Sequence, residues 1–256
     1  VALGYQALST QNFTSATNTY NTAVGYQSGL SITTGAYNTL IGGLAGDALT
    51  VGNTNTVVGA YALTADTKGD RNVAIGFAAL ENQNFTTSTD SYNVAVGYDA
   101  GNDITTGTLN TFIGGLAGDA TTTASNNVAV GYLALSDNST GATNTAVGTS
   151  ALENNTTASY NTAVGYQSLY SNTTGNALAA LSYKALYTTT GSNDSAVGYS
   201  ALRQNTSGNT NTAVGDRALY SNTTASNNTA VGYQAGYSNT TGQEITAVGR
   251  FALYAN

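Results

Sequence analysis

Residues 161–169 read Asn-Thr-Ala-Val-Gly-Tyr-Gln-Ser-Leu, and variants of this stretch recur along the whole chain. The central glycine returns every 17 residues, apart from two spacings of 21 and one of 16. Ser182 takes the place of the glycine in one repeat. Self-similarity at a fixed period is the signature of a repeat protein. The glycines of the series are at positions 4, 25, 42, 59, 76, 97, 114, 131, 148, 165, 198, 215, 232 and 249.

The spacing of the glycines predicts a single repeat array over residues 1–256, with about fifteen coils. Residues 1–72 and 73–144 both follow the spacing 21, 17, 17, 17 and look like a duplicated block, while residues 145–256 are more uniform. Both 21-residue coils contain Asn-Phe-Thr, at 12–14 and 84–86. The chain begins and stops within a repeat and shows no polar cap. Since arrays need caps to cover their terminal edges, we expect a section of a longer fibre, or copies that stack end to end.

Positions in a coil are numbered here from its central glycine, so that Ala163 is at −2 and Leu169 at +4. Position −1 is always Val, Ile or Leu, position −2 is mostly Ala, and position +4 is Leu or Gly. These apolar clusters are too short for helices and are separated by Asn, Thr, Ser and Gly, which favour turns. The pattern predicts an all-β fold, a parallel β-solenoid with two short strands and two turns per coil.

The apolar positions −1 and −2 are adjacent, so in a strand their side chains point to opposite faces. A lone solenoid has one interior, and strands that are apolar on both faces are usually buried on both. We expect the Ala row at −2 to lie where subunits meet, because small residues allow close approach. The alternative is that these alanines face solvent. Where position +4 is Gly, a nearby large residue is expected to fill the space: Ile32, Ile104, Leu44 and Leu116.

The composition excludes most enzyme chemistry. The chain has no Cys, His, Met, Trp or Pro, only 19 charged residues, and a net charge of −7. It therefore has no Ser–His or Cys–His nucleophile and no ordinary zinc or haem ligands, so we expect no cofactor and no metal. A net negative chain is unsuited to nucleic acid, and no apolar run is long enough to span a membrane. Asp66 with Asp70, and residues 99–103, have oxygens that suit calcium, but we expect solvated acidic turns.

Residues 72–76 (Asn-Val-Ala-Ile-Gly) and 127–131 (Asn-Val-Ala-Val-Gly) resemble the head repeat of trimeric autotransporter adhesins, the YadA-like heads. The longer form at residues 161–175 is similar to repeats in phage and large-virus fibre proteins. The resemblance covers nearly the whole chain, although the adhesin repeat is typically shorter and the additional residues here are expected to enlarge one turn. It implies a left-handed, homotrimeric β-roll displayed outside a bacterial cell or on a virion, where it binds host or other surfaces.

A surface stripe at position +5 is the candidate binding site. Coils stack about 4.8 Å apart, so residues at one position form a row, here of tyrosines with one cation. Such a row suits glycans or another surface, and the alternative is that the rings only stack on one another. The tyrosines at +1 are expected to be structural. The stripe consists of Tyr170, Tyr187, Arg203, Tyr220, Tyr237 and Tyr254.

Three functions remain open. The first is a non-enzymatic structural and adhesive fibre segment, in a surface adhesin or a virion tail fibre. The second is an ice-binding solenoid, prompted by threonine pairs such as residues 173–174, although adjacent threonines in a strand would face opposite ways. The third is a polysaccharide-processing enzyme, which would need a pair of carboxylates at fixed geometry. Only three glutamates and ten scattered aspartates are present. We expect the first function.

Overall fold

The structure is a computed structural model that describes residues 1–12 and 18–255. Phe13 and Thr14 of the first Asn-Phe-Thr stretch, and the last residue, lie outside the described residues. The chain divides into two compact units, Val1–Asn127 (unit 1) and Val128–Asn256 (unit 2), and each is described by itself. Within the described ranges the fold is all-β, with no helix.

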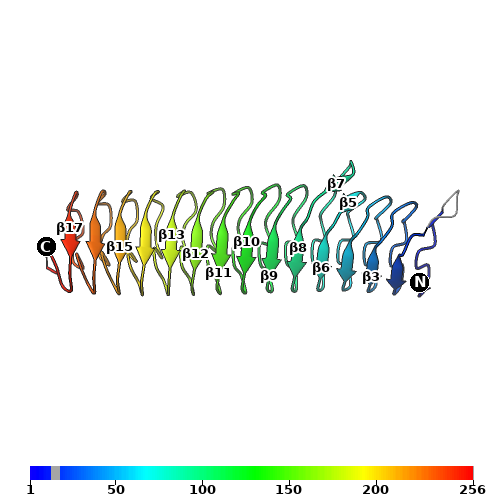
Figure 1. Cartoon of the computed structure of the whole chain (residues 1–256), viewed down its shortest axis with the longest axis horizontal. Helices are drawn as coiled ribbons and strands as arrows, with labels where there is room; N and C mark the ends of the chain where they lie inside the picture. The colour runs from blue at the N-terminus through cyan, green and yellow to red at the C-terminus, as the bar shows by residue number, and fades with distance from the viewer. Residues whose placement is uncertain (13–17, 256) are drawn as a thin grey trace. The chain divides into compact units, whose positions relative to one another are not determined.

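The fold is a parallel β-solenoid, as the glycine spacing predicted, with about 14 coils where the spacing predicted about fifteen. Each coil contributes one short strand that ends just before the central position, and two coils of unit 1 add a second strand. Figure 1 shows the strands of each unit following one another coil by coil. Neighbouring strands pair in parallel at the same repeat position, so that Ala163 lies beside Ala146 and Val164 beside Val147. The strands of unit 1 are β1 (Ala2–Leu3), β2 (Thr22–Val24), β3 (Thr39–Ile41), β4 (Thr56–Val58), β5 (Gly69–Asp70), β6 (Val73–Ile75), β7 (Thr89–Asp90), β8 (Val94–Val96) and β9 (Thr111–Ile113). Those of unit 2 are β10 (Val128–Val130), β11 (Thr145–Val147), β12 (Thr162–Val164), β13 (Ala179–Leu181), β14 (Ser195–Val197), β15 (Thr212–Val214), β16 (Thr229–Val231) and β17 (Thr246–Val248).

The prediction of two strands per coil was wrong, because the second apolar cluster of each coil forms turns. Positions +2 and +4 adopt the left-handed backbone region, as at Gln167 (φ 53°) and Leu169 (φ 51°). Coil-to-coil hydrogen bonds continue through these turns: the Leu152 N–H donates to the Ser168 carbonyl at 3.0 Å. Glycine enters this region without strain, which explains why position +4 alternates between Gly and Leu. A buried leucine there offsets the strain by its burial.

The alanine row at −2 faces the inside of each coil, contrary to the expectation that it meets a neighbouring subunit. Ala163 and Ala213 are 0% exposed, whereas the adjacent Val164 and Val214 are 38% and 37% exposed. The reason is the narrow interior, where leucines at +4 such as Leu169 already supply the apolar volume. A small residue must therefore lie at −2, and the larger residue at −1 points outward.

Where position +4 is glycine, other apolar side chains fill the space that a leucine would occupy. The structure confirms that Ile32 and Ile104 pack near glycines at +4, and both are fully buried. The prediction for Leu44 and Leu116 was wrong, because both are only partly buried and do not fill this space. The space is filled instead by Leu40 and Phe112, which occupy −2. A methyl group added at Gly118 would lie 2.7 Å from the Phe112 ring.

Asparagine side chains form ladders inside the coils at −4 and +7. At −4, the Asn161 Nδ2 donates to the Gly175 carbonyl at 2.9 Å, and its Oδ1 accepts from the Leu178 N–H at 3.0 Å. At +7, the Asn172 Nδ2 donates to the Asn155 Oδ1 at 3.1 Å. These amides satisfy backbone groups that the turns leave unpaired inside the solenoid.

Candidate functional site

The tyrosines at +5 in unit 2 form the row that the sequence predicted. The ring centroids of Tyr170 and Tyr187 lie 5.2 Å apart, with their planes 6° from parallel. Tyr220 stacks on Tyr237 at 5.2 Å, and Tyr237 stacks on Tyr254 at the same distance. The fixed coil period places identical side chains one coil apart, which is close enough for offset stacking. All the predicted tyrosines of the stripe therefore stack on a neighbour.

Arg203 joins the two tyrosine stacks. Its guanidinium carbon lies 5.7 Å from the ring centroid of Tyr187 and 5.9 Å from that of Tyr220. Its Nη1 donates to the Tyr220 hydroxyl at 3.0 Å. A guanidinium stacks well on aromatic faces and stays charged at any physiological pH. The six predicted residues thus form one continuous row with a positive charge inside it.

Stacking determines what this row presents outward. Each ring in a stack covers the face of its neighbour, so the faces that a sugar ring or a base would stack against are occupied. The edges and the phenol hydroxyls remain, on side chains that are partly buried or, at Tyr254, exposed. The row therefore offers hydrogen-bond donors and positive charge. The stacking is present in the structure, and binding at this row stays a prediction.

The tyrosines at +1, which were expected to be structural, form a second stacked and exposed row. The Tyr183 ring centroid lies 5.5 Å from that of Tyr166 and 4.9 Å from that of Tyr199. Lys184 connects the two rows, because its Nζ lies 5.3 Å from the Tyr183 centroid at +1 and 5.2 Å from the Tyr187 centroid at +5. We call the combined surface of the +1, +2 and +5 rows between Tyr166 and Tyr254 the aromatic–cation edge.

Two further cations lie on the aromatic–cation edge. The Arg217 guanidinium carbon is 5.5 Å from the Tyr199 centroid, and that of Arg250 is 4.7 Å from the Phe251 centroid. With Lys184 and Arg203, they are all the basic residues of positions 145–256. Sequence reasoning identified only Arg203 and missed the others. The available signal was their position, one or two residues after the central glycine and next to a tyrosine row.

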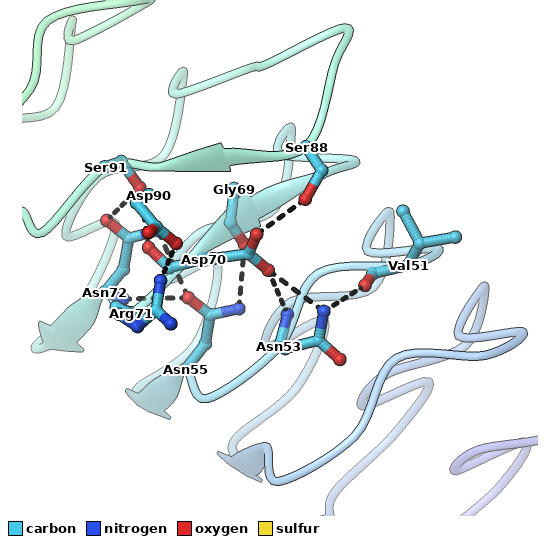
Figure 2. A network of polar contacts seen from close by, with 10 residues as sticks. All are labelled: Val51, Asn53, Asn55, Gly69, Asp70, Arg71, Asn72, Ser88, Asp90 and Ser91. Atoms are coloured by element: carbon cyan, nitrogen blue, oxygen red, sulfur yellow. Dashed lines mark hydrogen bonds and ion pairs between the residues drawn. The ribbon is translucent and has the colours of Figure 1, made fainter.

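A second polar cluster lies in unit 1, where β7 of the longer coil pairs with β5 of the preceding coil to form a two-stranded sheet (Figure 2). Asp70 Oδ1 accepts from the Asn53 N–H at 2.6 Å, and Asp70 Oδ2 accepts from the Ser88 hydroxyl at 2.7 Å. Arg71 and Asp90 form an ion pair at the outer side of this sheet. The carboxylate of Asp70 therefore links three coils.

Asp66 is buried inside the coil that also contains Asp70 and β5. Its Oδ2 accepts from the Gln83 Nε2 at 2.7 Å, and its Oδ1 accepts from the N–H groups of Gly69 at 3.0 Å and Phe85 at 3.2 Å. Burial raises the pKa of Asp66 above the usual value for an aspartate, and the hydrogen bonds only partly oppose this effect. The expectation of solvated acidic turns was wrong for Asp66 and Asp70, which are 0% and 6% exposed. Their carboxylates connect coils.

In the other calcium candidate, residues 99–103, the two aspartates remain at the surface. Asp103 is exposed, and its Oδ1 accepts from the Asn82 Nδ2 at 3.2 Å. Asp99 is partly exposed, and a hydrogen bond to it raises the pKa of Tyr98. Across residues 1–12 and 18–255 there is no group of three or more acidic, histidine or cysteine side chains placed to hold a metal ion.

Among residues 128–255 one carboxylate is buried, at the position in the −4 ladder that asparagine occupies in most coils. Asp194 is 0% exposed. Its Oδ2 accepts from the Asn205 Nδ2 at 2.8 Å, and its Oδ1 accepts from the Asn211 N–H at 2.8 Å. Burial raises the pKa of Asp194 to about 7, against the smaller opposing effect of these hydrogen bonds. Asp194 therefore titrates near neutral pH.

Comparisons of the chain with family models, curated proteins and solved structures gave no match. In the described part of the chain, no helix is long and apolar enough to cross a bilayer.

Proposed function

We propose that this chain is a non-enzymatic, structural and adhesive segment of an extracellular fibre, in a cell-surface adhesin or a virion tail fibre. Copies associate side by side as a homotrimer of left-handed β-rolls. The resemblance of the repeat to adhesin heads and viral fibres supports the handedness, the location and the number of copies. The association itself is supported by an observation on the outer face of the strands.

That observation is a row of branched apolar side chains that a single chain leaves partly exposed at −1. In coils of unit 2 such as those of Val164, Leu181 and Val197, the −1 side chain keeps between 38% and 40% of its surface exposed. Contiguous apolar surface of this kind marks interaction sites in soluble proteins. The row in unit 2 consists of Val130, Val147, Val164, Leu181, Val197, Val214, Val231 and Val248.

The direction of this row favours association between parallel copies. It follows successive strands, so two copies aligned in register place valine against valine in every coil. Most soluble homo-oligomers have closed rotational symmetry, which such an alignment satisfies about an axis parallel to the row. Burying one valine from each coil would add roughly 1 kcal/mol per coil, since about two fifths of the side chain is still exposed. Association through the exposed row would therefore add stabilisation in every coil that takes part.

Sedimentation analysis of the purified chain tests the association. We expect a trimer for the unchanged chain and a folded monomer for the double variant Val214→Glu, Val231→Glu, because each carboxylate would be desolvated in the interface. The control is Ser207→Glu, Thr224→Glu, which adds the same charges at exposed turn positions. A monomeric unchanged chain, or a trimer that both double variants leave intact, would refute the proposed interface.

Ice binding is kept as a second candidate, because the outer face has the spacing that such a surface needs. Threonine at −3 and valine at −1, as in Thr229 and Val231, both lie outward on the same strand. The threonine pairs considered in the sequence, such as residues 173–174, lie in turns and do not form this face. The face is interrupted by Ala179 and Ser195, which favours association over ice. Thermal hysteresis in a monomeric sample would favour ice binding.

We propose no catalytic role, because the carboxylates of Glu81 and Glu153 hydrogen-bond to neighbouring side chains and line no substrate site in the described part of the chain. Glycan cleavage needs two carboxyl groups facing each other across a bound substrate. The Oε2 of Glu81 accepts from the Asn102 Nδ2 at 2.9 Å, and Glu153 lies 3.5 Å from the Tyr170 hydroxyl. No cavity that would hold a substrate occurs in the residues that the structure describes. Depolymerisation of a polysaccharide by the purified chain would contradict this part of the proposal.

A further inference from the structure

We infer that the aromatic–cation edge of unit 2 binds linear acidic glycans, polysaccharides that carry carboxylate or sulfate groups. This inference rests on the adhesive part of the proposed function and names the chemical class of its ligand. It depends on three features of the edge: the distribution of charge, the orientation of the rings, and the repeat along the solenoid.

Charge is the first feature. Lys184, Arg203, Arg217 and Arg250 lie in four of five successive coils, and each is within 6 Å of at least one aromatic ring. Two acidic residues lie in or beside the edge: Asp216, whose Oδ1 is 3.9 Å from the Arg217 Nε, and Glu153, whose Oε1 is 3.5 Å from the Tyr170 hydroxyl. The edge is therefore positive, although the whole chain has a net charge of −7. A concentrated positive row on an acidic protein favours an anionic ligand.

Ring orientation distinguishes between anionic ligands. Single-stranded nucleic acid is bound on aromatic faces that are free to stack with bases. Here the rings of Tyr183 and Tyr199 are within 5° of parallel and cover each other, as do Tyr170 and Tyr187 within 6°. Neutral sugars also need free ring faces for stacking. Only at the C-terminal end of the edge does a ring lie edge-on to its neighbours, where Phe251 is nearly perpendicular to Tyr233 and Tyr254. Along the stacked part, the groups left to a ligand are phenol hydroxyls beside guanidinium and ammonium groups, which all donate to oxygen anions.

The repeat along the solenoid favours a linear ligand. Coils are spaced about 4.8 Å apart, so the donors form a straight ladder, and the part of unit 2 that the structure describes has no pocket for a peptide side chain. Lys184 places its charge between Tyr183 and Tyr187, which joins the +1 and +5 rows into one surface. An extended polymer with a charge on successive sugar units would contact several coils at once. Weak contacts in each coil then add up along the chain.

Binding to immobilised polysaccharides tests the inference, with polygalacturonate, dextran sulfate and neutral dextran as probes. Single-stranded oligothymidylate of similar charge serves as the polyanion control. We expect binding to both acidic polysaccharides that weakens as salt increases, and little binding to dextran or oligothymidylate. The variant Arg203→Gln, Arg250→Gln should lower the affinity for the acidic polysaccharides roughly tenfold or more.

A matched pair of lysine variants separates a local effect from a change in net charge. Lys184→Gln removes a cation of the aromatic–cation edge, whereas Lys68→Gln removes a cation in unit 1 whose Nζ donates to the Thr86 carbonyl at 3.0 Å. We expect only Lys184→Gln to weaken binding, with the thermal unfolding of both variants close to that of the unchanged chain. Equal effects of the two variants would overturn the inference.

The remaining outcomes are also decisive. Equal binding to dextran would overturn the acidic class while leaving an adhesive role, and equal binding to oligothymidylate would show an unselective polyanion surface. Binding to none of the probes, in samples that sediment as trimers, would overturn the inference and leave the proposed self-association standing. Failure of the proposed function would be seen separately, as a monomer in sedimentation.

Discussion

Gly165 and Ser182 approach each other so closely that a methyl group added at Gly165 would lie 2.6 Å from the Ser182 carbonyl oxygen. Central glycines such as Gly148 and Gly215 approach the backbone of the next coil equally closely, and they combine this with a positive φ that glycine adopts readily. Ser182 has a φ of 123° at this position, where the other coils have glycine. The serine is therefore held in a strained backbone conformation by the coils on either side.

We expect Ser182→Gly to stabilise unit 2 by about 1 kcal/mol, because relief of backbone strain exceeds the added entropy of the unfolded chain. Denaturant unfolding of both proteins measures the difference. Ser171→Gly is the control, at a position without a positive φ, and should destabilise by up to about 1 kcal/mol. Loss of stability in Ser182→Gly would show that the serine side chain makes a contact that outweighs its strain.

The free energy of unfolding should fall as pH rises from about 4 to about 7, because of Asp194. Its pKa is about 7 in the folded chain and 3.8 in the reference state, so between these pH values the folded state keeps a proton that the unfolded state has lost. By linkage, stability is lost as pH rises through this range, and the total loss from Asp194 is on the order of 4 kcal/mol. Asp194→Asn should remove the Asp194 part of this slope, and at pH 8 it should unfold at a higher denaturant concentration than the unchanged chain.

Unfolding by denaturant at pH 5 and pH 8 measures this effect. The exposed Asp137→Asn is the control and should leave the slope unchanged. Asp66 in unit 1 contributes in the same direction, since burial raises its pKa as well. Stability that rises between pH 5 and pH 8 in the unchanged chain, and in Asp194→Asn alike, would show that Asp194 is ionised at little cost.

The inward orientation of the −2 row leads to a prediction that separates folding from association. Ala213 is fully buried in a single chain, so Ala213→Leu should cost about 1–3 kcal/mol through overpacking, and Ala213→Glu should prevent unit 2 from folding. Val214→Thr changes the exposed neighbour and should leave the fold of the chain intact. Circular dichroism at low protein concentration measures the fold. If the Ala213→Glu variant folded but no longer associated, the alanine row would lie in a subunit interface and not inside the coil.

The period of the glycines was sufficient to predict the solenoid and the register of its strands. A fixed spacing aligns equal residues in neighbouring coils, and this alone brings Tyr170 beside Tyr187. The face of the alanine row could not be deduced from alternation, because both −1 and −2 are apolar. A signal was nevertheless present: Leu40 and Phe112 replace alanine at −2 in coils where position +4 is glycine. Such an exchange of volumes indicates that the two positions meet inside the coil.

The candidate site was only partly predictable. The stripe at +5 follows from the period, but the position of Lys184 between two tyrosine rows depends on the turn after the central glycine. That turn has a positive φ at +2, which spacing alone does not show. The burial of Asp66 and Asp194 was missed for a related reason. Both replace uncharged residues of the inner rows, and an aspartate in a polar sequence is ordinarily assigned to the surface.

The relation between Phe112 and Gly118 gives a test of complementary volumes inside the coil. Phe112→Ala should destabilise unit 1 by about 3–5 kcal/mol, since it leaves a cavity, and Gly118→Leu should also destabilise, since the new side chain meets the Phe112 ring. The double variant restores the pairing of alanine at −2 with leucine at +4 seen in other coils. We therefore expect it to be more stable than the sum of the single effects by about 1–3 kcal/mol. A double-mutant cycle by denaturant unfolding measures this coupling. The control combines Phe112→Ala with Gly46→Leu, which lies in a separate coil, and there the two losses of unfolding free energy should simply add. Additivity in both pairs would mean that the residues at −2 and +4 are chosen independently.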